Sequence, residues 1–288
     1  MSNVTIRALE RPELDLVLDW AAKENANPGL HDANSFWAAD PDGFLAAERN
    51  GQLVGALSLV SYDGRFGFVG LFIVRPDARK QGVGRALWQD GMKTMRSRLL
   101  AGMTIGLDGT LAMRAAYEKS GFVFHSRNIC FQGVGVKPLA PIAGVAPAAR
   151  VPFASILALD SEHFPAPRPR FLTPWLRQPD SAAFAATPRG TMGKLGGYAV
   201  VRKCRNGFKI GPLFAKDDAS AEALLLSCSA HAAGQPLFID VPEGNAPALA
   251  LTAKHQFKEI SSCARMYHGP VPVFNQPGVY GVTTSELG

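Results

Sequence analysis

The sequence of 288 residues lacks features that mark several common classes of protein. It has no run of five or more lysines and arginines, and its basic residues are dispersed, so a net charge of +6 does not by itself indicate a nucleic-acid partner. No apolar stretch approaches the ~20 residues that a membrane-spanning helix needs. The first residues, MSNVT, do not resemble a secretory signal. We therefore expect neither a nucleic-acid partner nor a membrane partner.

Cysteine is also scarce. The four cysteines, Cys130, Cys204, Cys228 and Cys263, form no C-x-x-C pair and have no zinc-ligand spacing. This pattern predicts no metal site and indicates reduced, mostly buried thiols in a cytoplasmic protein, with a disulfide as the alternative.

Two nucleotide-binding fingerprints are missing as well. There is no G-x-x-x-x-G-K-[ST], and a G-x-G-x-x-G pattern fails because Leu87 stands where the third glycine would be. A triphosphate-binding loop and a dinucleotide-binding fold are thereby excluded.

The stretch at residues 70–92, GLFIVRPDARKQGVGRALWQDGM, is the most informative part of the chain. Its apolar run at residues 71–74 predicts a strand, which Pro76 ends because proline has no backbone donor. Apolar residues then recur at helical spacing from Val83 to Met95. The predicted order is strand, basic glycine-containing loop, helix.

This order builds an anion site. The first amides of a helix have no internal partner and lie at the positive end of the helix dipole, so they bind phosphate well. Gly82 and Gly84 permit close approach to the backbone, and Arg79, Lys80 and Arg85 add positive charge. The alternative is an ordinary turn with a solvated basic face.

The loop resembles the acyl-CoA loop of the GNAT superfamily of N-acetyltransferases, whose pattern is [QR]-x-x-G-x-[GA]; here it is Arg79-x-x-Gly82-x-Gly84. In that family the loop amides hold the CoA pyrophosphate, and the preceding strand offers backbone groups to the pantetheine arm. The resemblance assigns cofactor binding to Phe72, Ile73, Val74, Arg79, Lys80, Gln81, Gly82, Val83, Gly84 and Arg85.

A second GNAT motif lies downstream. The family pattern is roughly N-x-x-A-x-x-L-Y-E-K-x-G-F, and residues 110–122 are TLAMRAAYEKSGF, with Thr110 in place of the asparagine and Met113 in place of the first alanine. Two motifs in order and at the expected spacing are far more specific than one.

The resemblance makes Tyr117 the general acid that protonates the CoA sulfur, because a phenol with a pKa near 10 is protonated at neutral pH. The alternative is a core tyrosine. No base is encoded by a motif. Asp108 and Glu48 are candidates, acting directly or through water, and either could instead be a cap or an exposed strand charge.

The segment at residues 25–41 shows no periodicity, and by resemblance it is a helix-rich connection that lines the acceptor side. His31, Asp32 and Trp37 are the candidate substrate contacts within it, and ordinary surface-loop packing is the alternative.

After this segment, Asn50-Gly51 between two apolar runs predicts a hairpin.

The second half repeats the first. Residues 245–257, NAPALALTAKHQF, align without gaps on residues 110–122 at a shift of 135, with Thr252 at the position of Tyr117. Strands are predicted at residues 197–201, 210–215 and 237–241. A proline- and alanine-rich stretch between the halves indicates a linker.

The second copy lacks the cofactor loop. Residues 216–222, KDDASAE, contain no glycine and three acids, which would repel a pyrophosphate; the same residues would also cap a helix. Either interpretation predicts a single acyl-CoA site, in the first half.

We therefore predict an α+β fold of the α/β three-layer type, in which two tandem GNAT-like domains each have a mixed, mostly antiparallel twisted sheet flanked by helices. The predicted parts are an acetyltransferase domain at residues 1–136, a linker at 137–150 and a degenerate domain at 151–288. The predicted function is acetyl-CoA-dependent acetylation of a small-molecule amine. A non-catalytic acyl-CoA sensor and a protein or peptide acetyltransferase are the alternatives, and a homodimer is compatible with the sequence.

Overall fold

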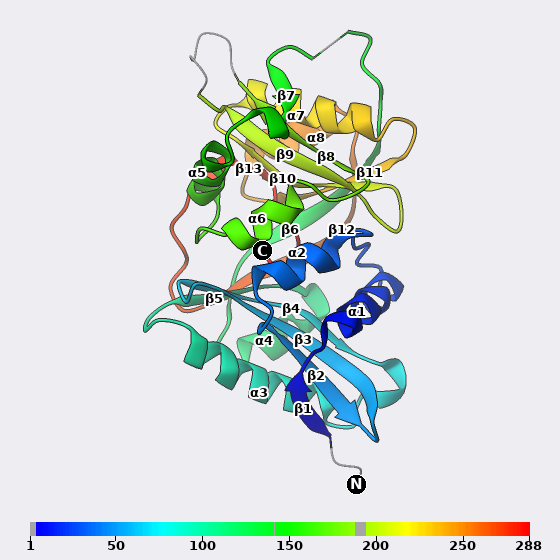
Figure 1. Cartoon of the computed structure of the whole chain (residues 1–288), viewed down its shortest axis with the longest axis vertical. Coiled ribbons are helices and arrows are strands. Elements are labelled where there is room, and N and C mark those ends of the chain that lie inside the picture. The colour runs from blue at the N-terminus through cyan, green and yellow to red at the C-terminus, as the bar shows by residue number, and fades with distance from the viewer. Residues whose placement is uncertain (1–3, 141, 188–193) are drawn as a thin grey trace.

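The computed structural model describes residues 4–140, 142–187 and 194–288. Residues 1–3 of the predicted first domain and residue 141 of the predicted linker lie outside the described residues. Figure 1 shows an elongated molecule with one half of the chain at each end and residue 288 between the halves.

The first half contains β1 (Thr5–Ala8), α1 (Arg11–Lys23), α2 (Asp32–Ala39), β2 (Phe44–Arg49), β3 (Gln52–Tyr62), β4 (Phe66–Val74), η1 (Pro76–Ala78), α3 (Val83–Arg98), β5 (Thr104–Thr110), η2 (Leu111–Met113), α4 (Arg114–Glu118) and β6 (Val123–Val134). The second half contains β7 (Val145–Pro147), η3 (Ala148–Arg150), α5 (Phe153–His163), α6 (Pro169–Trp175), β8 (Ser181–Ala186), β9 (Gly197–Lys203), β10 (Phe208–Ala215), α7 (Asp218–His231), β11 (Pro236–Pro242), α8 (Ala246–Lys254), β12 (Lys258–His268), η4 (Gln276–Gly278) and β13 (Val279–Gly281).

Alternation along the strands builds three layers. In β3, Leu57 and Leu59 pack toward α3, whereas Ala56 and Val60 pack in the cluster that contains α1. Helices α1 and α2 thus lie on one face of the sheet and α3 and α4 on the other (Figure 1). The predicted fold class is confirmed.

The two halves exchange strands β6 and β12. Strand β12 pairs antiparallel with β5 of the first half, and β6 pairs antiparallel with β11 of the second; β6 and β12 also pair with each other. The result is one continuous sheet in the order β1-β2-β3-β4-β5-β12-β6-β11-β10-β9-β8-β7, with β13 beside β10. The strands of each half therefore complete the hydrogen bonding of the other.

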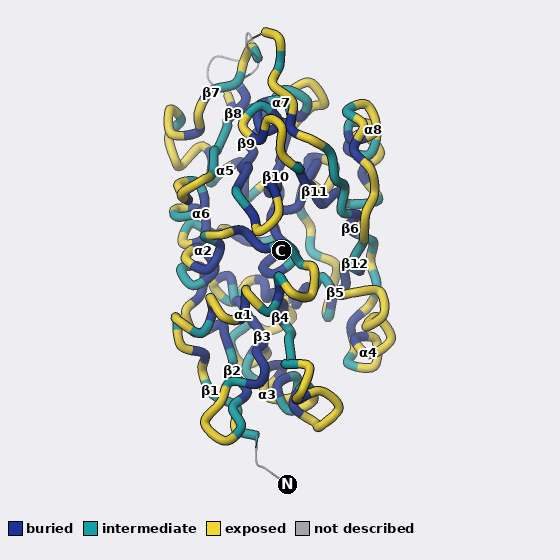
Figure 2. The backbone as a smooth tube through the Cα atoms, turned by 90° about the vertical axis from the view of Figure 1, so that its right-hand side faces the viewer, coloured by how far each residue is buried: buried dark blue, intermediate teal, exposed yellow. Residues whose placement is uncertain are grey.

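The halves also share one hydrophobic core. Phe36 from α2 stacks on Trp175 from α6 with ring centroids 6.3 Å apart. The same buried cluster contains Leu14 and Phe66 from the first half and Tyr198 from the second. Figure 2 shows buried backbone running through both halves and exposed backbone mainly in loops and outer helices.

Several local expectations are refined. The Asn50-Gly51 turn has positive φ at both residues, as a tight hairpin requires. The segment at residues 25–41, which shows no periodicity and which the resemblance describes as helix-rich, contains α2. The predicted linker contains β7, which pairs with β8. The second motif, at residues 110–122, contains a 3₁₀ turn followed by the short α4. All four cysteines are free thiols.

None of the helices in the described residues is long and apolar enough to cross a membrane.

The strand exchange predicts that the chain unfolds as one unit. Calorimetry of the full chain should show a single transition whose van't Hoff and calorimetric enthalpies agree, because neither half has a complete sheet or core alone. A fragment of residues 1–136 should show no cooperative transition, since β5 and β6 then lack β12 between them. Two separate transitions, or a folded fragment, would contradict the prediction.

Candidate active site

The site begins where two parallel strands part. Strand β4 pairs with β5 only as far as Val69 opposite Leu107. Beyond that point a bulge, with Leu71 at a φ of 43°, bends β4 away from β5. The backbone groups of β4 that face β5 are therefore left without a strand partner.

A cleft of about 520 Å³ opens between the parted strands, within the size range of small-molecule sites. Its walls come from β4, β5, the end of α1, the region of α4 and the end of the chain. The lining residues are Ala21, Glu24, Ala26, Val69, Gly70, Leu71, Phe72, Ile73, Val74, Arg79, Leu107, Asp108, Gly109, Thr110, Met113, Tyr117, Ser285 and Glu286.

Helix α3 starts beside this cleft with its first amides free, and Gly84 in its first turn packs against Phe72 and Val74 of the cleft wall. Gly82 precedes the helix with a φ of 84°, and no side chain caps it. Among the described residues, the amides of residues 80–85 donate no hydrogen bond, and the first helical bond runs from Ala86 N to Gly82 O at 3.0 Å. A Cβ on Gly82 would meet open space, so the loop is accessible to an anion.

The basic side chains of the loop have different surroundings. Lys80 and Arg85 are exposed and free to contact an anion. Arg79 donates to Val74 O at 2.9 Å and forms an ion pair with Glu24, which fixes it at the cleft wall. Gln81 accepts a hydrogen bond from Arg49 at 2.6 Å.

Tyr117 lies on the opposite wall. Its side chain packs against Trp88 with ring centroids 5.3 Å apart, and only 9% of the residue is exposed. Gly109 of β5 makes room for it, because a Cβ there would lie 2.4 Å from the Tyr117 ring. Burial raises the pKa of Tyr117 to about 12. Its hydroxyl makes no hydrogen bond to another described residue.

Asp108 is held in an ion pair. Arg265 of β12 donates to both of its carboxylate oxygens at 2.7 Å, and Asn128 of β6 donates to both at 3.1 and 3.2 Å. The side chain has no exposed surface. These contacts leave no lone pair directed at a substrate proton, so they argue against Asp108 as the base.

Glu48, the other candidate base, is not among the residues that line the cleft. Its carboxylate accepts a hydrogen bond from Arg7 at 2.8 Å near the hairpin end of β2. This is a partly exposed surface ion pair.

The three candidate acceptor contacts also lie elsewhere. His31 is 3.0 Å from Asp180, and Asp32 is fully buried against Arg202 at 2.9 Å, so both join the two halves. Trp37 stacks on Phe44. The segment at residues 25–41 contributes Ala26 to the cleft, and Ala21 and Glu24 come from α1 and its C-cap.

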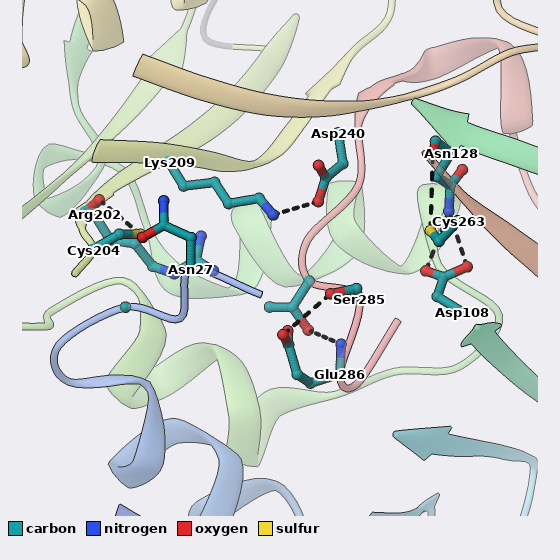
Figure 3. A network of polar contacts seen from close by, with 12 residues as sticks. Asn27, Asp108, Asn128, Arg202, Cys204, Lys209, Asp240, Cys263, Ser285 and Glu286 are labelled. Carbon is teal, nitrogen blue, oxygen red and sulfur yellow. Dashed lines mark hydrogen bonds and ion pairs between the residues drawn. The ribbon is translucent and has the colours of Figure 1, made fainter. Parts of the chain in front are cut away.

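Sequence reasoning missed Ser285 and Glu286. The final segment shows no periodicity that marks either residue, and it reaches the cleft because the two halves pack together. Figure 3 shows both residues near the buried Lys209–Asp240 ion pair and the Asp108 cluster.

The second half shows what closes the corresponding cleft. Strand β10 pairs with parallel β11 as far as Ile210 opposite Ile239, and β13 then pairs with β10 at Leu213 and Phe214. Strand β13 thus occupies the gap between β10 and β11 that corresponds to the cleft of the first half. Asp217 caps α7 by accepting from Ser220 N at 2.7 Å, as the helix-cap interpretation expects. We retain the prediction that this half binds no CoA.

Two family models match the chain, both described as acetyltransferase (GNAT) domains. One covers residues 10–122 and the other residues 156–281, so together they span most of the sequence. The chain is a tandem GNAT acyltransferase. The resemblance inferred from the two motifs is confirmed, and the non-catalytic alternative is set aside.

Similar proteins agree with this assignment. This GNAT protein is 26% identical over 278 residues to the holothin acyltransferase of Pseudoalteromonas sp., covering 96% of this chain and 92% of the relative. It is 34% identical over 95 residues to the mycothiol acetyltransferase of Streptomyces coelicolor, covering 32% of this chain and 31% of the relative.

Solved structures share the tandem GNAT fold. A protein of Pyrococcus horikoshii assigned to the acetyltransferases superposes with a TM-score of 0.83 at 24% identity, covering 100% of this chain and 97% of that one. A tandem GNAT protein from the clavulanic acid biosynthesis pathway gives a TM-score of 0.62 at 17% identity, covering 93% of this chain and 100% of that one.

The geometry of the loop before α3 predicts that an acidic residue at its glycines weakens acyl-CoA binding. Gly84→Asp should weaken acetyl-CoA binding at least about 10-fold, because it places a carboxylate among the amides that would face a pyrophosphate. Ala219→Asp is the matched control, since Ala219 occupies the same turn of α7 in the second half. Calorimetric titration measures both affinities. Equal weakening by the two variants, or by the control alone, would contradict the assignment.

Proposed function

We propose that this GNAT protein transfers an acetyl group from acetyl-CoA to the amine of a small molecule, at the cleft between β4 and β5. The observation that carries this proposal is the cleft itself, which has free helix amides at one end and a buried, protonated tyrosine in its wall.

The residues fit the co-substrate. The amides of residues 81–85, with Lys80 and Arg85, would hold the pyrophosphate, and the unpaired edge of Phe72, Ile73 and Val74 would bind the pantetheine arm. Acetyl-CoA supplies the activated thioester. In the second half, β13 occupies the equivalent strand edge, which supports a single site.

Tyr117 would serve as the acid. The neutral amine attacks the thioester carbonyl carbon, a C–N bond forms, and the C–S bond breaks. Tyr117 donates its hydroxyl proton to the departing sulfur. The raised pKa keeps this phenol protonated at every pH at which the protein is commonly assayed.

A small acceptor suits the volume of the cleft, about 520 Å³. The final segment of the chain covers one side of it with Ser285 and Glu286, and a peptide would need an open groove there. The relative that matches nearly the whole chain is named for a small molecule, holothin. The free thiols fit a reducing compartment, and the proposal therefore places the enzyme in the cytoplasm.

Removing the hydroxyl group of Tyr117 tests its proposed role as the general acid. Tyr117→Phe should lower kcat about 100-fold, while the dissociation constant of acetyl-CoA stays within about twofold, because the hydroxyl acts on the leaving sulfur. Thiol release with a panel of amines and calorimetric titration measure the two quantities. Unchanged kcat in the variant would remove Tyr117 from this role.

The pH dependence supplies a second test. A phenol donates only while protonated, so activity that depends on Tyr117 should fall only as pH rises through about 12. We expect no alkaline loss of kcat between about pH 7 and pH 10, where an ordinary tyrosine would already be half ionised. Circular dichroism at each pH checks that the fold persists. A reversible loss of kcat centred well below pH 10 would contradict the proposed donor.

A further inference from the structure

The buried acids of this protein follow a rule with one exception. Each carboxylate in the described interior is paired with a cation, in the pairs Asp32–Arg202, Asp40–Arg98, Asp108–Arg265, Asp160–Arg168 and Asp240–Lys209. Glu286 is only 8% exposed, yet it forms no ion pair in the described part of the chain. The hydrogen bond to its carboxylate comes from the adjacent Ser285, at 3.1 Å. An unpaired buried carboxylate is unfavourable, so its retention suggests a function.

Glu286 lies where the two strands part. Its backbone packs so closely on Gly70, the first residue of β4 after the last pair with β5, that a Cβ on that glycine would lie 2.0 Å from Glu286 O. Tyr62 fixes the segment by donating from its hydroxyl to Leu287 O at 2.8 Å. The side chain of Glu286 is thereby anchored in the wall of the cleft.

The positions of Glu286 and Tyr117 are complementary. Glu286 lies against β4 at Gly70, whereas Tyr117 lies against β5 at Gly109, two residues beyond the last pairing residue, Leu107. A proton acceptor and a proton donor thus face one cleft from the two strands that diverge around it. A thioester held between β4 and β5 would therefore lie between Glu286 and Tyr117.

The charged surroundings of Glu286 suit a base. Burial raises its pKa above the ordinary value, which strengthens it as a proton acceptor. Lys209 of β10 and Arg202 of β9 act in the opposite direction and favour the carboxylate, while Asp32 of α2 opposes it. Lys209 is bound by Asp240 (Figure 3), and Arg202 is bound by Asp32. Both cations therefore support the charge of Glu286 without occupying its oxygens.

We propose that Glu286 is the general base that takes the proton of the attacking amine, and that the second half of the chain therefore completes the active site of the first. This inference rests on the proposed function. As the C–N bond forms, the ammonium proton passes to the Glu286 carboxylate. As the C–S bond breaks, Tyr117 protonates the sulfur. The proton on Glu286 returns to Tyr117 through solvent, so amine and thioester become amide and thiol with no net change in the enzyme.

Glu286→Gln tests the base directly. It should lower kcat about 100-fold or more, leave the dissociation constant of acetyl-CoA within about twofold, and abolish the acidic limb of the wild-type pH profile. Its melting temperature should equal or exceed that of the wild type, because a buried unpaired charge is removed. The matched control is Glu48→Gln, which neutralises a carboxylate outside the cleft and should leave kcat unchanged.

A second variant separates chemistry from structure. Glu286→Ala should be equally slow, and added formate should restore part of its activity by occupying the vacated space as a replacement base. Retention of more than about half of the wild-type kcat by both variants would overturn the assignment while leaving the proposed function intact. Loss of activity with a lowered melting temperature and no rescue would overturn it in favour of a structural role. Failure of the wild type to acetylate any amine would instead overturn the proposed function, and the base with it.

Discussion

The pairing of β12 with β5 is the constraint on which the rest of the structure depends. Strand β5 needs a partner on the side away from β4, and the chain supplies that partner from the other half. Once β12 lies there, β6 must pair with β11 to complete its own edge. One sheet and one shared core follow, and Glu286 and Leu287 near the end of the chain are held against β4 and β3 of the first half.

Each half of the molecule has a pair of parallel strands that diverge, and the gap between them is filled differently in the two halves. Where parallel strands diverge, their inner backbone groups need hydrogen-bond partners. In the second half β13 provides them, and Tyr280 from this strand donates from its hydroxyl to Asp218 at the start of α7. In the first half the final segment stops short of the gap and covers only its side. The asymmetry between the copies therefore arises as much from the course of this segment as from the loss of loop glycines.

Local features were predictable from the sequence, and long-range ones were not. The strand, loop and helix around Gly82 depend on proline, glycine and helical periodicity within about 25 residues, so their pattern is visible in the chain. Asp108 illustrates the limit: its position after a strand is apparent, but Arg265, which binds it, lies 157 residues away on an exchanged strand. Glu286 is beyond such reasoning, since its burial and its missing partner are properties of the packed halves. The segment that contains α2 was obscured by low periodicity over only eight residues.

The distribution of charge explains how one cleft could hold two different substrates, one toward each end. At the end formed by the loop, Lys80 and Arg85 are exposed and the amides of α3 are free, which favours a polyanion. Toward the other end, the charges of Asp108 and Asp240 are neutralised by their ion-pair partners Arg265 and Lys209. Glu286 is the carboxylate there without an ion pair to any described residue, and its negative charge favours a cationic amine. Under the proposed function, opposite preferences at the two ends would orient the pyrophosphate and the amine on either side of the place where β4 and β5 separate. The ion pairs in these walls hold the surrounding strands in place and would keep the reacting groups in position, which is the main contribution a protein makes to direct acyl transfer.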